Sequence, residues 1–238
     1  MIPKVIHYCW FGNNPLPYEV KECIKSWKKF CPNYIIKQWN ENNFDVNQHP
    51  FIAKAYKEKA WAFVSDYARL KIIYDEGGIY LDTDVELLKS LNDLLSNKCY
   101  VGIQQQNDVI ATGLGFGAEK HNKVVYEMLK QYDSITYDQE KQNEIACPWL
   151  NTYAIKQFGD YNPEVVNFFS DVTIYPPKYF DPLAPGNLKN LKCKDTYSIH
   201  HYSASWMKKS VVIRRKLIRI IGEEFIYKIK NLKRKKDG

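Results

Sequence analysis

The N-terminal part of the chain switches between the period of a strand and the period of a helix, and this constrains the fold more than any other feature. Residues 5–11 form a largely apolar run that ends at a Gly-Asn-Asn-Pro turn, which is typical of a buried strand. Across 19–30, apolar side chains recur every three or four residues, as on a helix, and 34–39 have the composition of a second strand. A strand, a helix and a strand in this order predict a parallel α/β sheet.

Further elements continue the α/β pattern. Residues 51–76 are mostly helical in pattern and end at a Gly-Gly pair, as helices often do. We expect, in chain order, a short strand at 79–81, a helix starting at Ser90, a glycine-rich strand region at 100–118, a helix at 122–132 and irregular segments at 148–190. The chain of 238 residues is long enough for one large domain, which we place at 1–206, followed by a separate segment at 207–238.

Positive charge is concentrated at the C-terminal end. Residues 207–238 hold twelve Lys and Arg against three acidic residues, whereas 1–206 carry a formal net charge of −2. A domain that binds nucleic acid normally has a basic face on its folded body. The distribution therefore argues against DNA or RNA as a partner.

Cysteine spacing and hydropathy indicate the cytoplasm. The six cysteines form no C-x-x-C pair, so we expect reduced, partly buried thiols and no zinc ribbon. The chain has no apolar run long enough to span a membrane. Its N-terminus does not resemble a signal peptide, because Pro3, Lys4 and His7 interrupt any apolar core.

Two aspartates directly follow the strand expected at 79–81. Asp82 and Asp84 are two residues apart, so the alternation of a strand places both on the same side. Two carboxylates this close repel each other unless a cation lies between them, and a hard divalent ion such as Mg²⁺ or Mn²⁺ suits oxygen ligands. An Asp-x-Asp motif alone is common by chance, and a solvated strand end would explain it as well.

An acid and a base on the preceding helix add specificity to this motif. Asp66 and Arg69 are three residues apart and share one helical face. As a pair they offer a pure acceptor and a guanidinium fork, which together can grip adjacent hydroxyls of a sugar. The alternative is an ordinary surface ion pair, which contributes little. The ordered combination with Gly-Gly and Asp-x-Asp is more specific than any of its parts.

Two other motifs are rejected. An EF-hand loop starting at Asp82 would need glycine at its sixth position, where the chain has Leu87. Residues 113–118 match the loose dinucleotide pattern G-x-G-x-x-A, but the preceding strand signal is short and no clear ribose-binding acid follows. We interpret 113–118 as a glycine-rich loop where backbone approaches a ligand.

Three blocks of the chain, residues 2–12, 62–69 and 77–84, resemble the DXD-containing sugar transferases of glycosyltransferase family 32. That family includes bacterial capsular polysaccharide transferases and yeast initiating mannosyltransferases, and the blocks are more distantly similar to the glucosyltransferase domain of clostridial toxins. The resemblance runs from residue 2 to 206. It implies a GT-A fold, which is a nucleotide-sugar-binding α/β/α sandwich with a mostly parallel central sheet.

The resemblance also implies the reaction. It predicts a metal-dependent, retaining transfer of a hexose from a UDP- or GDP-linked sugar to a lipid-linked or oligosaccharide acceptor in surface or capsular polysaccharide biosynthesis. Two mechanisms stay open, front-face attack by the acceptor hydroxyl and a covalent intermediate. The sequence also leaves open a toxin-like transferase that glycosylates a protein, and a non-catalytic nucleotide- or carbohydrate-binding module tethered to a membrane.

For the donor, the resemblance assigns residues in the first two blocks and the strand. It implies that the ring of Trp10 stacks on the nucleotide base. Asp66 and Arg69, with Ser65 beside them, would hold the donor sugar, and Tyr80 would lie near the donor.

For the metal and the diphosphate, the resemblance assigns the two aspartates and a late segment. Asp82 would contact the ribose and a metal-bound water, and Asp84 would bind Mn²⁺ or Mg²⁺ directly. His201 is the best match for the third metal ligand, with His200 as the rival, and Trp206 would lie near the diphosphate. Either histidine could instead be a hydrogen-bonded core residue, an alternative that suits His200 better.

In the segment 207–238, apolar side chains recur at helical spacing and form a stripe, and most basic residues lie outside this stripe. The stripe consists of Leu217, Ile221, Phe225, Ile229 and Leu232. Basic amphipathic helices bind anionic membrane surfaces. We expect peripheral attachment to the cytoplasmic leaflet, where lipid-linked acceptors reside. The alternative is a helix that packs on the body and leaves a solvated basic cluster.

Overall fold

The structure, a computed structural model, describes residues 1–186 and 189–203. Its elements, in chain order, are β1 (Val5–Cys9), α1 (Tyr18–Phe30), β2 (Ile35–Trp39), α2 (Pro50–Lys57), α3 (Trp61–Glu76), β3 (Gly78–Tyr80), β4 (Val85–Leu87), η1 (Asn92–Leu94), β5 (Cys99–Gly102), η2 (Thr112–Leu114), β6 (Phe116–Ala118), α4 (Lys123–Lys130), α5 (Cys147–Lys156), β7 (Asn167–Phe168), β8 (Thr173–Tyr175), α6 (Pro177–Phe180) and β9 (Ser198–His200). Trp206 and the whole segment 207–238 lie outside the described residues, so the expected domain boundary is not tested.

A seven-stranded sheet in the order β2-β1-β3-β6-β5-β8-β7 forms the centre of the described structure. The strands β2, β1, β3, β5 and β8 run in one direction, and β6 and β7 run in the other. Strand β1 pairs in parallel with both β2 and β3, and helix α1 connects β1 to β2. The predicted strand, helix and strand are therefore confirmed, as is a mostly parallel sheet.

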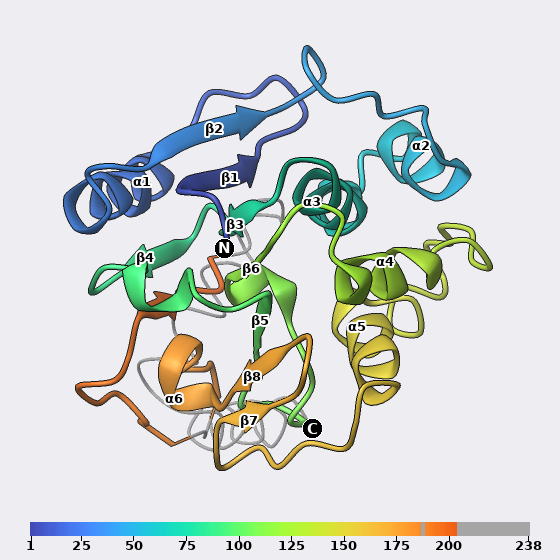
Figure 1. The fold of residues 1–238 in the computed structure, drawn as a ribbon. Coiled ribbons are helices and arrows are strands. Elements are labelled where there is room, and N and C mark those ends of the chain that lie inside the picture. Colours follow the sequence, from blue (N-terminus) through green and yellow to red (C-terminus); the bar gives the residue numbers. More distant parts are fainter. Residues whose placement is uncertain (187–188, 204–238) are drawn as a thin grey trace, which may run out of the picture.

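Helices cover both faces of the sheet (Figure 1). One apolar cluster packs α2, α3, α4 and α5 against one face, and a second packs α1, η1 and the β4 strand against the other. Helix α3 has buried residues on several sides, including Val64, Ala68, Leu70 and Ile73. The result is a three-layered α/β/α sandwich, as expected.

The Gly77-Gly78 pair turns the chain from α3 into β3 and fixes where β3 begins. Both glycines have positive φ, +69° at Gly77 and +106° at Gly78, a region that other residues rarely adopt. A Cβ on Gly78 would lie 2.8 Å from Nε2 of His7 and 2.9 Å from the carbonyl oxygen of Val5. Glycine is therefore required here for space as well as for conformation.

Four expected elements differ from the structure. The helical stretch expected at 51–76 is two helices, α2 and α3, and the region 148–190, expected to be irregular, contains most of α5 together with β7, β8 and α6. The helix expected from Ser90 is only the short 3-10 turn η1, although the Ser90 hydroxyl accepts the backbone N–H of Asn92 as a helix N-cap would. The glycine-rich region at 100–118 is not one strand but β5, a loop closed by the Ile103–Ile110 bridge, and β6.

The remaining expectations on helix ends and cysteines hold. Helix α4 begins after Asn122, whose side chain accepts the N–H of Val124 at 2.8 Å. All six cysteines are free thiols, and only Cys193 among them is exposed. Within the described ranges, the helices are all too short or too polar to cross a membrane.

Candidate active site

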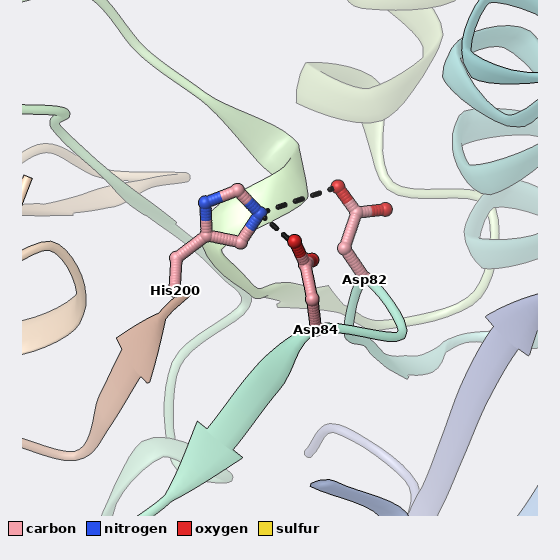
Figure 2. A group of neighbouring side chains, drawn as sticks. All are labelled: Asp82, Asp84 and His200. Carbon is pink, nitrogen blue, oxygen red and sulfur yellow. Dashed lines mark ion pairs between the residues drawn. The ribbon is translucent and has the colours of Figure 1, made fainter. Parts of the chain in front are cut away.

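Two aspartates and one histidine meet beyond the end of β3 (Figure 2). Asp82 is the second residue after β3, and Asp84 immediately precedes β4. The chain between them forms a turn, closed by a hydrogen bond from the N–H of Val85 to the carbonyl of Asp82 at 3.0 Å. This turn, and not the alternation of a strand that we expected, brings the two carboxylates together.

The third member of this group comes from the far end of the described chain. Strands β4 and β9 are antiparallel, with His200 opposite Val85. Nε2 of His200 therefore lies 3.1 Å from Oδ1 of Asp84 and 3.9 Å from Oδ2 of Asp82. The three ligand atoms lie within 4.8 Å of one another.

The structure brings His200 to the aspartates, and not the expected His201. Neighbouring residues along an extended chain point to opposite sides, so only one of the two histidines can face the carboxylates. Nε2 of His201 instead lies 2.9 Å from Oε2 of Glu86. The pairing register of β9 with β4 determines which histidine faces the carboxylates. Two adjacent histidines in a sequence give no information about that register.

Arg69 links the helix motif to the Asp-x-Asp motif. Its Nη2 atom lies 3.0 Å from Oδ1 of Asp66 and 3.0 Å from Oδ1 of Asp82. Its Nε donates to the carbonyl oxygen of Ser65 at 3.2 Å. The expected pair of Asp66 and Arg69 is therefore formed, and it is a buried pair, since only 6% of the Arg69 side chain is exposed.

Tyr80 completes the support of Asp82. This buried tyrosine on β3 donates from its hydroxyl to Oδ1 of Asp82 at 3.2 Å. Its ring lies 5.1 Å from the guanidinium carbon of Arg69, within range of a cation–π contact. Tyr80 thus contacts both Asp82 and Arg69.

The two aspartates have different electrostatic environments. For Asp84, burial would raise the pKa, but the charge and hydrogen bond of His200 and two hydrogen bonds from Ser203 lower it well below its usual range. For Asp82, burial raises the pKa more than Arg69 and His200 lower it. Burial alone would lower the pKa of His200, and the two aspartates raise it. Asp84 is therefore the firmer anion, and His200 carries a positive charge more readily than a free histidine.

Asp66 is a third carboxyl group beside the aspartate pair. Burial raises its pKa to about 6, against the lowering effect of Arg69 and with a further increase from Asp82. The thiol of Cys147, at the start of α5, is hydrogen-bonded to Asp66 and lies 3.3 Å from Oγ1 of Thr112. Asp66, on α3, thus contacts the first residue of α5.

One glycine of the expected ligand loop contacts the site from η2. A Cβ added to Gly113 would lie 2.3 Å from Oδ2 of Asp82 and 3.1 Å from Nη1 of Arg69. Backbone does approach a functional group here, as the glycine-rich pattern indicated, but that group is the carboxylate of Asp82. Sequence spacing gave no sign of this partner.

Asp181 is a site neighbour that sequence reasoning missed. It follows α6, is fully buried, and accepts the N–H of Gln105 on Oδ2 at 2.9 Å. Tyr202 is hydrogen-bonded to the same carboxyl group, and its ring stands edge-on to His200 with centroids 4.1 Å apart. No motif surrounds Asp181, so nothing in the sequence could have singled it out.

Trp10 lies at the same edge of the sheet as the aspartates. It follows β1, which pairs in parallel with β3 so that His7 is opposite Tyr80. Trp10 is partly buried, and its indole N–H donates to the carbonyl oxygen of Asn14 at 2.6 Å. Trp206, the other expected aromatic contact, lies outside the described residues.

Comparisons with known proteins point to glycosyltransferases. Residues 17–101 match a family described as the glycosyltransferase sugar-binding region containing the DXD motif. An uncharacterized glycosyltransferase, L373 of Acanthamoeba polyphaga mimivirus, is 29% identical over 221 residues, which cover 87% of this chain and 84% of the relative. Inositol phosphoceramide mannosyltransferase 3 of Schizosaccharomyces pombe is 29% identical over 119 residues, 48% of this chain and 33% of that protein.

A solved structure shows the fold independently of close sequence similarity. The glycosyltransferase PaToxG superposes with a TM-score of 0.52 at 21% identity, over 66% of this chain and 69% of its own. The family match and the two relatives confirm the resemblance to the DXD-containing sugar transferases and show a glycosyltransferase, and the superposition shows the α/β/α sandwich of the GT-A fold.

Proposed function

We propose that this glycosyltransferase depends on a divalent cation, Mn²⁺ or Mg²⁺, held by Asp82, Asp84 and His200. The observation that carries the proposal is the convergence of two carboxylates and an imidazole, whose ligand atoms lie within 4.8 Å of one another. Carboxylate oxygens suit both ions, and a single imidazole nitrogen adds a ligand that divalent transition metals accept. A bound cation would neutralise the negative charge that grows on a diphosphate as it leaves the sugar.

The contacts around the two aspartates support this role. Asp84 accepts the N–H and the hydroxyl of Ser203 on Oδ2, at 2.8 and 2.9 Å. Asp82 is held through Oδ1 by Arg69 and Tyr80. Both side chains are therefore oriented before any ligand binds, and one oxygen of each, Oδ1 of Asp84 and Oδ2 of Asp82, is directed to Nε2 of His200. Such preorganisation reduces the reorganisation that binding and catalysis require.

We further propose that Asp66 and Arg69 hold the donor sugar, with Asp66 as the direct contact. Arg69 already donates from Nε to Ser65 and from Nη2 to two carboxylates, so its main role is to fix Asp66 and Asp82. The Asp66 carboxyl group, with a pKa raised to about 6, is then the acceptor presented to sugar hydroxyls. Ser65 contributes through its backbone oxygen.

For the nucleotide, we propose stacking of the base on Trp10. The indole N–H is already bonded to Asn14, so the ring offers its face for a stacking contact. Parallel strands end at the same edge of an α/β sheet, which is where such sheets bind ligands. Trp10 after β1 and Asp82 after β3 therefore bracket a donor that lies across the ends of these two strands.

The proposed reaction is transfer of a hexose, with retention, from a nucleoside-diphosphate sugar to a glycan acceptor in surface or capsular polysaccharide biosynthesis. Retention and the acceptor class rest on the resemblance to family 32. Attachment of 207–238 to an anionic membrane would bring the enzyme to a lipid-linked acceptor.

Hydrolysis of the donor tests the proposal without a known acceptor. UDP- and GDP-sugars are incubated with the full chain in Mn²⁺, in Mg²⁺ and in EDTA, and release of the nucleoside diphosphate is measured. We expect release from at least one donor with either metal and loss of release in EDTA. Asp84→Asn should reduce the rate about 100-fold or more, because a ligand of the charge-neutralising ion is removed.

Glu86→Gln is the matched control for Asp84→Asn. Glu86 is two residues from Asp84 along the chain but pairs with His201, outside the group of three. We expect it to keep the wild-type rate. Equal activity of wild type and Asp84→Asn, or full activity in EDTA, would refute metal dependence at this site.

A further inference from the structure

Two buried polar atoms beside the proposed metal group have no hydrogen-bond partner among the described residues. They are Nδ1 of His200 and Oδ1 of Asp181. Nδ1 of His200 can donate a hydrogen bond when it carries a proton. Oδ1 of Asp181 can only accept a hydrogen bond when the carboxyl group is ionised. Buried polar atoms are rarely left unsatisfied, so such a pair calls for an explanation.

The His200 ring has two different edges (Figure 2). Nε2 is directed at Asp82 and Asp84, and Nδ1 is directed away from both. A histidine binds a metal through a nitrogen that carries no proton, and the proton then resides on the other nitrogen. If Nε2 is the ligand atom, Nδ1 needs an acceptor.

Asp181 is held so that one oxygen remains for this purpose. Its Oδ2 accepts the backbone N–H of Gln105 at 2.9 Å. The side-chain amide of Gln105 fixes the same region by donating to the carbonyl oxygens of Asp181, at 3.0 Å, and Lys189, at 2.9 Å. Tyr202 bonds the carboxyl group and packs edge-on against His200, so it connects the two residues.

We propose that Asp181 is a positioning residue for His200. Its Oδ1 accepts the hydrogen bond from Nδ1–H through one bridging water, and so keeps the proton off Nε2, the atom that binds the cation. This inference rests on the proposed function, because it takes His200 as a metal ligand. Carboxylates behind metal-binding histidines commonly fix the ring and its tautomer in this way.

The charges are consistent with the proposal. Burial raises the pKa of Asp181 to about 6, while Gln105, Tyr202 and His200 lower it. Asp181 also contributes to the raised pKa of His200, after the larger effects of Asp84 and Asp82. The charge of Asp181 thus acts on the His200 ring in the direction that favours a proton on it.

Asp181→Asn gives a sharp test, because an amide has one acceptor oxygen where a carboxylate has two. The amide of this variant can accept from Gln105 or from His200, but its NH₂ group must then face the other donor. We expect the dissociation constant of Mn²⁺ alone, measured from the electron paramagnetic resonance signal of the free ion, to rise about 10- to 100-fold. An unchanged dissociation constant would overturn the proposal.

Gln105→Ala is the matched control. It removes both side-chain hydrogen bonds that tether this region and leaves the backbone N–H that Asp181 accepts. If Asp181 serves only to anchor the Gln105 region, both variants should weaken Mn²⁺ binding alike, and this result would also overturn the proposal. We expect Gln105→Ala to bind Mn²⁺ nearly as tightly as wild type.

His200→Ala separates the failure of this inference from failure of the proposed function. If His200→Ala loses Mn²⁺ affinity and Asp181→Asn does not, only the role of Asp181 is refuted. If His200→Ala binds Mn²⁺ as wild type does, the metal group itself is wrong and both proposals fail.

A measurement on the wild-type chain covers the case in which Asp181→Asn does not fold. With diamagnetic Mg²⁺ bound and ¹⁵N-labelled histidine, the nitrogen shifts of His200 report which ring nitrogen carries the proton. We expect a protonated Nδ1 and an unprotonated Nε2. The opposite tautomer would overturn the proposal.

Discussion

Arg69 on helix α3 and Asp82 after strand β3 are joined by an ion pair with 3.0 Å between Nη2 and Oδ1. The same Nη2 atom also contacts Asp66, so one buried guanidinium lies between two partly buried carboxyl groups. This contact connects the layer of helices to the edge of the sheet where the aspartates lie. It makes Arg69 a structural residue as well as a part of the site.

Arg69→Met should therefore destabilise the protein strongly. The substitution keeps an apolar stem but leaves the partly buried Asp66 and Asp82 without their counter-charge. Breaking a buried ion pair from one side costs about 3 to 5 kcal/mol. Urea unfolding followed by circular dichroism measures this loss in the free energy of unfolding.

Lys71→Met is the control for Arg69→Met, two residues along the same helix. Lys71 pairs with Asp75 at 2.7 Å, but both side chains are partly exposed. Exposed pairs contribute about 1 kcal/mol or less, so the unfolding free energy should barely change. Comparable losses in the two variants would contradict the claim that burial makes the Arg69 pair special.

The adjacent histidines should differ in function. His200→Ala removes a side chain that faces Asp82 and Asp84, whereas His201→Ala removes one that pairs with Glu86. We expect Mn²⁺-dependent donor hydrolysis to fall about 100-fold in His200→Ala and to stay near wild type in His201→Ala. The reverse pattern would restore the expectation from the sequence, that His201 is the ligand.

Gly113→Ala should damage the site without a large effect on the fold. Its Cβ would lie 2.3 Å from Oδ2 of Asp82, so the carboxylate or η2 must move. A displacement of about 1 Å at a reacting group can cost about 100-fold in rate. Donor hydrolysis at saturating Mn²⁺ measures the loss.

Gly186→Ala controls for the substitution of glycine itself. Gly186 has a φ of +96°, which an alanine adopts only with strain, but a Cβ there meets nothing within 4 Å. We expect a stability loss of about 1 kcal/mol and an unchanged rate. A rate loss in both variants would mean that general strain, and not contact with Asp82, explains the result.

His7 should make stability depend on pH in the acid range. Burial lowers its pKa from 6.5 to about 4, against the opposing effect of the hydrogen bond with Gly77. Nδ1 accepts from the indole of Trp39 at 3.0 Å, and Nε2 lies 2.9 Å from the carbonyl oxygen of Gly77. Below pH 6.5 the unfolded chain binds a proton at His7 that the folded chain does not. The folded state is therefore fully favoured above this pH and loses up to about 3 kcal/mol as the pH falls to the folded-state pKa.

His7→Gln isolates this contribution from the other titrating groups. Glutamine offers one donor and one acceptor but does not titrate, so the acid-range loss attributed to His7 should be absent from the variant. The measurement is urea unfolding of both proteins at several pH values between about 4 and 7. Parallel pH profiles for the two proteins would show that His7 is not responsible.

The sequence predicts most of the sheet because its signals are local. The apolar runs, the helical period of α1 and the Gly77-Gly78 stop each depend on neighbours in the chain. The ion pair of Asp66 with Arg69 is likewise a contact within one helix turn. These elements, and this contact, are confirmed by the structure.

The rest of the site depends on contacts that local patterns do not contain. Which histidine faces the aspartates follows from the register of β9 on β4, which joins residues more than a hundred positions apart. The contact of Gly113 with Asp82, and the position of Asp181 near His200, arise in the same way. Asp181 has no flanking motif, so only the assembled fold reveals it.

The segment 207–238 stays a prediction from sequence. Its twelve basic and three acidic residues, with an apolar stripe between them, favour contact with an anionic membrane. Each basic residue near such a surface contributes about 1 kcal/mol, and salt screens this attraction. We expect the full chain to sediment with vesicles that contain phosphatidylserine or phosphatidylglycerol, and to be released at high salt.

Deletion of 207–238 tests this against the alternative that the segment packs on the body. Membrane contact predicts loss of vesicle binding with an unchanged unfolding transition and unchanged hydrolysis of a soluble donor, because the site residues Asp82, Asp84 and His200 all precede the deletion. Packing on the body predicts the opposite, a destabilised domain, since apolar surface would be uncovered. A truncated chain that still binds anionic vesicles would refute the membrane role, because the sequence from 1 to 206 has a net charge of −2 and no comparable run of basic residues to supply the attraction.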